Sequence, residues 1–146
     1  GICRKGTKED YFHCTVCNLC LSMGMKHSHK CVENTGNSNC PCCNYDLFNS
    51  TDEIAVLKCG HIIHKECLVS YCKYSYECPL CKKSIGDMRE RWAMMTAYLA
   101  TVEMPQEYKG KTTNILCNDC EIKEMVPFNL ISHKCPQCNG YNTTSL

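Results

Sequence analysis

The chain has 146 residues, of which 17 are Cys and 6 are His, so cysteine alone makes up about an eighth of it. A cysteine content above roughly 8–10% marks a scaffold built on cysteine chemistry rather than on a large apolar core. Sixteen Lys and Arg against fifteen Asp and Glu give a formal charge of +1, too little to attract nucleic acid or a membrane surface. No apolar run approaches the ~20 residues that a bilayer requires, and no signal-peptide pattern is present. These observations exclude a membrane protein, a disordered tail and an enzyme with a large core.

The spacing of the cysteines favours metal over disulfides. Their number is odd, and Cys-x2-Cys pairs recur at 14/17, 17/20, 40/43, 78/81, 117/120 and 135/138. A two-residue gap lets both thiolates reach one tetrahedral ion about 2.3 Å away. Zinc is the preferred ion because it accepts mixed Cys and His ligands, and a reducing cytosol keeps the thiols available. Iron–sulfur clusters are the alternative for an all-Cys set.

The ligands form three clusters, at residues 3–31, 40–81 and 117–138. A polar, turn-forming linker at 33–39 separates the first two clusters, and a ligand-free stretch separates the last two. Each module of about 30–45 residues is too small for a core to stabilise it alone. Zinc must therefore supply on the order of 10 kcal/mol per site. We predict small zinc-stabilised modules of mixed α+β class with little regular structure.

The first cluster is irregular. His27 and His29 are alternatives for one ligand position, and His29 is preferred. Adjacent His13 and Cys14 point to opposite sides of an extended chain and so serve different ions. The predicted ligands are Cys3, His13, Cys14, Cys17, Cys20, His29 and Cys31. Seven ligands leave two sites short by one, so the missing ligand is expected upstream of Gly1, in keeping with a chain that is a piece of a longer protein.

The middle cluster resembles the RING-H2 family in the order and spacing of all eight ligands. They are Cys40, Cys43, Cys59, His61, His64, Cys67, Cys78 and Cys81. The resemblance implies alternating pairs in a cross-brace: one ion on Cys40, Cys43, His64 and Cys67, the other on Cys59, His61, Cys78 and Cys81. Cys42 is an alternative to Cys43 as a ligand, but Cys-x-Cys spacing disfavours it.

RING domains bind a ubiquitin-conjugating enzyme, and the resemblance carries that docking surface onto five positions: Cys42, Tyr71, Pro79, Leu80 and Lys82. No residue acts covalently, and Lys82 is the candidate linchpin that contacts both the conjugating enzyme and ubiquitin. Cys42 stands where the family usually has Ile, Leu or Val, which costs about 1 kcal/mol of apolar contact. Cys72 has no ligand partner in spacing and is predicted to be a buried thiol.

A helix is predicted over residues 85–104. Apolar residues recur at helical spacing at Met88, Trp92, Met95, Leu99 and Val102. Asp87 is positioned to cap its start, and Pro105 follows its end. We expect the apolar stripe to pack on neighbouring zinc modules rather than to form a partner-binding groove.

The third cluster is predicted to be a four-Cys zinc ribbon. Its ligands are Cys117, Cys120, Cys135 and Cys138, and residues 125–131 are expected to form its strands. His133 is expected to face solvent or to lie beside the ligands without binding the ion. Because basic residues are few, a protein is a better partner for this ribbon than nucleic acid.

Taken together, the modules resemble the CHY-zinc-finger RING-H2 ubiquitin ligases, including the plant BRUTUS-type members. The resemblance rests on the Gly1–Cys14 string, Cys17-Asn-Leu-Cys20, His29-Lys-Cys31, the RING-H2 ligands, Met104-Pro-x-x-Tyr108 and Tyr141-Asn-Thr143. It implies a CTCHY-type finger, N-terminally truncated, over residues 1–33, a RING-H2 domain over 39–84, a linking helix over 85–104 and a ribbon over 112–144.

The function implied is ubiquitin transfer from a charged conjugating enzyme to a lysine of a protein substrate, such as a transcription or iron regulator. The expected partners are the conjugating enzyme, ubiquitin and that substrate, with neither membrane nor nucleic acid. Four to five Zn²⁺ ions are expected, and the protein is expected in the cytoplasm and nucleus. The alternative is a non-catalytic scaffold of zinc modules that binds proteins without transferring ubiquitin.

Overall fold

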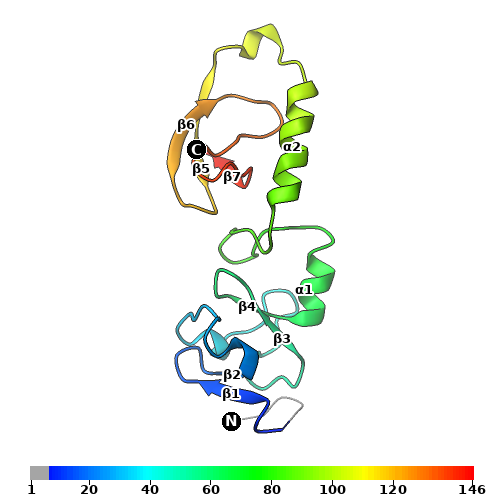
Figure 1. Ribbon diagram of the computed structural model, residues 1–146, viewed down its shortest axis with the longest axis vertical. Coiled ribbons are helices and arrows are strands. Elements are labelled where there is room, and N and C mark those ends of the chain that lie inside the picture. The colour runs from blue at the N-terminus through cyan, green and yellow to red at the C-terminus, as the bar shows by residue number, and fades with distance from the viewer. Residues whose placement is uncertain (1–6) are drawn as a thin grey trace. The chain divides into compact units, whose positions relative to one another are not determined.

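The computed structural model describes residues 7–146, which divide into two compact units between Leu80 and Cys81 (Figure 1). Regular structure is sparse and comes in short elements. Unit 1 holds β1 (Tyr11–Cys14), β2 (Leu19–Ser22), β3 (Ile54–Val56), β4 (Ile62–His64), α1 (Lys65–Tyr71) and two 3₁₀ turns, Met23–Met25 and Thr35–Asn37. Unit 2 holds α2 (Arg89–Thr101), β5 (Thr112–Cys117), β6 (Lys123–Pro127), β7 (Thr143–Ser145) and the 3₁₀ turn Gln106–Tyr108. No helix among the described residues has both the length and the apolar character needed to cross a bilayer.

The first module is built on an antiparallel hairpin of β1 and β2, in which His13 faces Cys20 across the strands. Leu19 and Leu21 alternate inward from β2 and are almost fully buried. The predicted linker, residues 33–39, makes contacts with the first module. Gly36 is buried, and its N–H donates to the carbonyl of Cys17 at 2.8 Å, so the linker packs against the module before it.

The middle module holds the paired strands β3 and β4 and the helix α1. Ile62 and Ile63 of β4 are buried, and α1 begins directly after His64. No pattern in the sequence predicts α1. Its seven residues are too few to show helical periodicity, and α1 owes its position to packing on β3 and β4.

In unit 2, α2 is shorter than the predicted segment 85–104. It starts at Arg89, with Met88 rather than Asp87 in the cap position, and the Asp87 carboxylate accepts the Arg89 N–H at 3.0 Å. It ends at Thr101, since Val102 is extended and Pro105 follows. The predicted stripe, from Met88 through Trp92 to Val102, is the half-buried side of this segment.

The third module is a three-stranded antiparallel sheet in the order β6-β5-β7 (Figure 1). Only β6 overlaps the stretch 125–131 that was expected to form the strands, and that expectation was wrong for 128–131. The central strand β5 ends at the first ligand, Cys117, and β7 begins after the last ligand pair. Ile115 of β5 and Val126 of β6 are buried. Asn129 instead folds 129–132 into a turn, its side chain accepting the Ile131 N–H at 2.8 Å.

The helix α2 packs on this ribbon through aromatic contacts. The rings of Trp92 and Tyr141 are 5.9 Å apart at their centroids, and the Thr96 and Tyr141 hydroxyls are hydrogen-bonded at 3.0 Å. A Cβ on Gly140 would lie 3.1 Å from the Trp92 Nε1, so a small residue is needed there. The helix therefore packs on a neighbouring zinc module, as the stripe indicated.

Replacing Gly36 by Ala should destabilise unit 1 by about 1–3 kcal/mol. An added Cβ would lie 2.6 Å from the Cys17 carbonyl oxygen and 2.6 Å from the Leu19 Cγ, both of which are fixed. Gly24→Ala is the matched control, because nothing lies within 4 Å of its added Cβ. Urea unfolding in the presence of zinc measures both free energies. Equal stability of the two variants would contradict the packing of 33–39 on the first module.

Candidate metal centres and protein-docking surface

Sixteen of the ligand candidates converge in four groups, each with its sulfur and nitrogen atoms within 4.8 Å of one another. The groups are Cys14, Cys17, His29 and Cys31; Cys40, Cys43, His64 and Cys67; Cys59, His61, Cys78 and Cys81; and Cys117, Cys120, Cys135 and Cys138. Three are Cys₃His sets and one is a Cys₄ set.

The distances within the second RING group and the Cys₄ set fit a tetrahedral zinc ion. Bonds of about 2.3 Å to sulfur and 2.0–2.1 Å to nitrogen place two ligand sulfurs about 3.8 Å apart and a sulfur and a nitrogen about 3.6 Å apart. In the Cys₄ set, the Cys117–Cys138 and Cys120–Cys135 sulfurs are 3.7 and 3.5 Å apart. The His61 Nδ1 lies 3.4 Å from the Cys59 sulfur and 3.5 Å from that of Cys78. Sulfurs at such separations are not bonded, and every cysteine of the described part is a free thiol.

The two middle groups interleave along the chain. The first takes the knuckle at Cys40 and Cys43 and then His64 and Cys67, which lie at the junction of β4 and α1. The second takes its first two ligands from the turn between β3 and β4. The two groups are the alternating sets that the RING-H2 resemblance implies. The segment from 59 to 67 carries ligands of both groups, so we expect the closing of one site to depend on the other.

Gly60 makes the turn between two of these ligands possible. Its φ of +94° is a conformation that L side chains rarely adopt. An added Cβ would also lie 2.6 Å from Val32 Cγ2, so the turn packs directly on the first module. Only glycine meets both requirements.

In the first group, the ligand histidine is His29 rather than His27. The His29 Nδ1 lies 2.8 Å from the Met25 carbonyl oxygen and its Nε2 lies 2.8 Å from the Cys31 sulfur. A carbonyl acceptor on Nδ1 fixes the tautomer and leaves Nε2 free to bind metal. His27 is exposed and belongs to none of the four groups.

Two further predicted ligands of the first cluster pair with each other. The Cys20 sulfur and the His13 Nδ1 are 3.7 Å apart across the hairpin, away from the group of four. Cys3, the remaining predicted ligand of the first cluster, lies outside the described residues. His13 and Cys20 therefore have the geometry of half a site.

In three of the four groups, one thiol holds back the ionisation of its neighbours. The backbone N–H of Cys17 is the main cause that lowers the pKa of Cys14 to about 6. Burial, with the hydrogen bond and the charge of Cys14, raises the pKa of Cys17 to about 12. Burial likewise raises the pKa of Cys67 and of Cys120 to about 12. Neighbouring thiolates are stable together only beside a cation, which the donor set and geometry identify as Zn²⁺.

Comparison with known proteins agrees with this geometry. Residues 38–82 match the family of the Ring finger domain, and residues 86–144 match the Zinc-ribbon family. The chain is 44% identical to Zinc finger protein BRUTUS of Arabidopsis thaliana over 145 residues, covering 98% of this chain and 12% of BRUTUS. It is 46% identical over 141 residues to E3 ubiquitin-protein ligase RZFP34 of the same plant, covering 96% of this chain and 48% of the relative. With E3 ubiquitin-protein ligase SRFP1 of Oryza sativa subsp. japonica the identity is 38% over 144 residues, covering 98% and 55%.

The chain thus carries a Ring finger domain followed by a zinc ribbon. It is homologous to the BRUTUS-type and RZFP34-type zinc finger proteins and spans between about an eighth and about half of these three relatives. Both family matches leave the first cluster outside their ranges, so its CTCHY assignment stays a prediction.

The RING leaves the predicted docking positions accessible to different degrees. Leu80 is 57% exposed, Cys42 and Lys82 are exposed, and Tyr71 and Pro79 are half-buried. More than half of Leu80 is therefore open to solvent, between two ligands of the second RING group.

The prediction of a buried thiol at Cys72 was wrong: Cys72 is exposed at the C-terminal end of α1. His133 is half-buried and is not a member of the Cys₄ set, as the sequence indicated. It packs against the Phe128 ring, 5.6 Å away at the centroids, and burial lowers its pKa.

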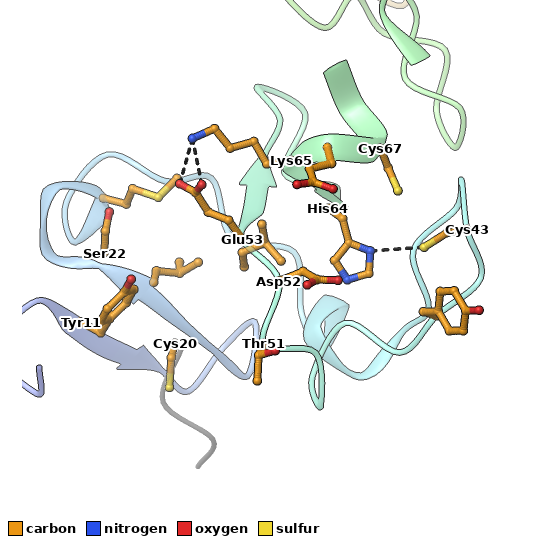
Figure 2. A pocket seen from close by; sticks show the side chains of 15 residues that line it. Tyr11, Cys20, Ser22, Cys43, Thr51, Asp52, Glu53, His64, Lys65 and Cys67 are labelled. Atoms are coloured by element: carbon orange, nitrogen blue, oxygen red, sulfur yellow. Dashed lines mark hydrogen bonds and ion pairs between the residues drawn. The ribbon is translucent and has the colours of Figure 1, made fainter. Parts of the chain in front are cut away.

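A cavity of about 690 Å³ lies between the first module and the RING (Figure 2). Figure 2 shows the His64 ring facing Cys43, at 3.3 Å from Nδ1 to sulfur, and the Lys65–Glu53 ion pair at 2.9 Å. The two charged side chains are more than half exposed, so the ion pair adds little stability. Cys20 and three ligands of the first RING group, Cys43, His64 and Cys67, line this cavity.

Cys59→Ser should remove two zinc ions, not one, because the interleaved RING groups close together. Cys120→Ser should remove one ion, since no ligand of another group lies between the first and last ligands of the Cys₄ set. Cys72→Ser is the control and should bind as much zinc as the parent chain. Zinc per chain after gel filtration measures all three. Loss of a single ion from Cys59→Ser, with a native circular dichroism spectrum, would contradict the interdependence of the two sites.

Proposed function

We propose that this chain is the ubiquitin-transfer part of a RING-type ubiquitin ligase. The observation that carries the proposal is the cross-braced pair of metal groups with Leu80 exposed between two of the ligands. Relatives that share this arrangement of RING and ribbon carry the name E3 ubiquitin-protein ligase. The first finger and the ribbon would contact the protein substrate, for which a transcription or iron regulator is our candidate, in the cytoplasm and nucleus.

The chemistry is positional. A lysine amine of the substrate attacks the thioester carbonyl that joins ubiquitin to the conjugating enzyme; an isopeptide bond forms, the carbon–sulfur bond breaks, and the amine proton passes to solvent. The RING contributes by holding the charged enzyme in the geometry of attack. Leu80, Pro79 and Tyr71 supply apolar contact to the conjugating enzyme. The Lys82 ammonium supplies hydrogen-bond donors where the enzyme meets ubiquitin. The zinc ions hold these residues in place and take no part in the reacting bonds.

Leu80→Ala should lower ubiquitin transfer at least tenfold without loss of zinc, because it removes a central apolar anchor of the docking surface. The measurement is self-ubiquitination against a panel of conjugating enzymes. Leu130→Ala is the matched control: it removes a leucine of nearly equal exposure, 53% against 57%, from the ribbon. No transfer by the zinc-loaded parent chain with any enzyme would favour the scaffold. An unchanged rate of ubiquitin transfer in Leu80→Ala would contradict the assigned docking surface.

Cys42 is the position where the docking surface departs from an aliphatic residue. Partial desolvation of its thiol, together with the negative charge of Cys40, raises the pKa of Cys42, so it stays a neutral thiol at neutral pH. It therefore contributes apolar contact, but less of it than a branched aliphatic side chain would.

Cys42→Ile should tighten binding of the uncharged conjugating enzyme about fivefold, the equivalent of roughly 1 kcal/mol of added apolar contact. Titration of a fluorescent conjugating enzyme with parent and variant gives the two Kd values. An unchanged or higher Kd for a zinc-loaded variant would exclude Cys42 from the contact.

A further inference from the structure

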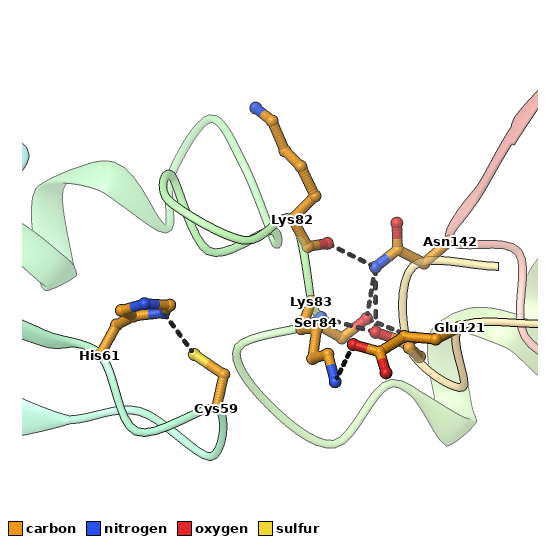
Figure 3. A network of polar contacts seen from close by, with 8 residues as sticks. Cys59, His61, Lys82, Lys83, Ser84, Glu121 and Asn142 are labelled. Atoms are coloured by element: carbon orange, nitrogen blue, oxygen red, sulfur yellow. Dashed lines mark hydrogen bonds and ion pairs between the residues drawn. The ribbon is translucent and has the colours of Figure 1, made fainter. Parts of the chain in front are cut away.

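The three residues that follow the last RING ligand, Lys82–Ser84, are held by the zinc ribbon through buried hydrogen bonds (Figure 3). The holding side chains are Asn142, which directly precedes β7, and Asp119, which lies inside the first ribbon knuckle. We call Asn142, Asp119 and their contacts to Lys82–Ser84 the clamp.

Asn142 is the centre of the clamp. Its side chain is 1% exposed, and its Nδ2 donates to the Lys82 carbonyl oxygen at 2.8 Å and to the Asp119 Oδ1 at 3.0 Å. The Ser84 Oγ is a third, longer contact at 3.2 Å. Its Oδ1 accepts from the Asn118 Nδ2 at 2.9 Å, which fixes the amide so that the NH₂ group faces Lys82.

Asp119 holds the same segment from a second side. Its Oδ1 accepts the Ser84 N–H at 2.7 Å, and its Oδ2 accepts the Ser84 hydroxyl at 2.8 Å. The ion pair of Lys83 with Glu121, at 2.8 Å, lies outside these bonds and is largely exposed on the Glu121 side. The backbone on both sides of Lys83 is thus anchored to ribbon residues.

The residue that this clamp fixes has an unusual backbone. Lys82 has a φ of +65°, in the left-handed region that non-glycine residues seldom occupy. Its carbonyl is bound by Asn142, whereas its side chain is exposed. Holding the carbonyl fixes the peptide plane, and with it the direction in which the side chain leaves the chain. The clamp therefore constrains the one charged residue of the proposed docking surface without touching its ammonium group.

We propose that Asn142 and Asp119 are positioning residues for ubiquitin transfer, acting through the backbone of Lys82. The proposal rests on the proposed ligase function and assigns the ribbon a part in the transfer step. Without the clamp, the Lys82 peptide would be free to leave its left-handed conformation, and its ammonium would reach the conjugating enzyme and ubiquitin in only a fraction of molecules.

The test is single-turnover discharge of a preformed conjugating enzyme–ubiquitin thioester to free lysine, using the zinc-loaded chain with Asn142→Ala, Lys82→Ala and both changes together. We expect Asn142→Ala to lower the saturating discharge rate about tenfold, with half-saturation changed less than twofold. In the Lys82→Ala background, Asn142→Ala should have no further effect, because the group it positions is gone. Asn114→Ala in β5, which removes an exposed amide outside the clamp, is the matched control.

Each outcome separates the two proposals. A parent chain that discharges no thioester overturns the proposed function. If the parent chain is active and Asn142→Ala keeps the parent rate, the positioning role alone is overturned. The same holds if the rate losses of Asn142→Ala and Lys82→Ala multiply in the double variant. If Asn142→Ala loses zinc or fails to fold, Asp119→Asn takes its place in the same cycle. That change keeps the size of the side chain, weakens its bonds to Ser84, and is judged by the same criteria.

Discussion

Four sets of cysteine and histidine side chains bring their ligand atoms within 4.8 Å of one another, and the rest of the structure depends on the cation that thiolates held so close require. The strands are three to six residues long, and the largest fully buried side chains are a handful of Leu and Ile residues. Elements of this size are marginal alone. Each ion joins segments that lie far apart in sequence, such as Cys43 and His64, and so replaces the core that the chain is too short to build.

The metal knuckles also dictate backbone conformation. In all five Cys-x2-Cys knuckles that supply ligands, the residue directly after the second cysteine has a positive φ; these residues are Asn18, Asn44, Lys82, Glu121 and Asn139. Asparagine tolerates this conformation, whereas Lys82 and Glu121 carry a cost of about 1–3 kcal/mol. Such residues persist where their surroundings over-determine them. For Glu121 a backbone bond to the Cys117 carbonyl at 2.8 Å does so, and for Lys82 the bond from Asn142 does.

The sequence predicts what has a short, regular spacing and misses what does not. The Cys-x2-Cys pairs and the apolar stripe of α2 have spacings of three or four residues, so both can be recognised from the sequence. The helix α1 and the strand β7 are too short to show a period. Asn142 is a single polar residue whose partners are 23, 58 and 60 residues away, so no local pattern reveals the clamp. Exposure of Cys72 likewise follows from how α1 is turned, which spacing does not encode.

The ligand chemistry gives the loaded protein a different electrostatic character from that of the bare chain. Each Cys₃His set with a divalent ion carries a net charge of −1, and the Cys₄ set carries −2. Thirteen thiolates and four Zn²⁺ ions together contribute −5, which turns the formal +1 of the sequence into −4. The isoelectric point of the metal-loaded protein therefore lies well below the value of about 7.5 calculated from the sequence. A chain that has lost an ion therefore differs in net charge from one that has kept it. Electrophoretic mobility reports the number of bound ions through that net charge.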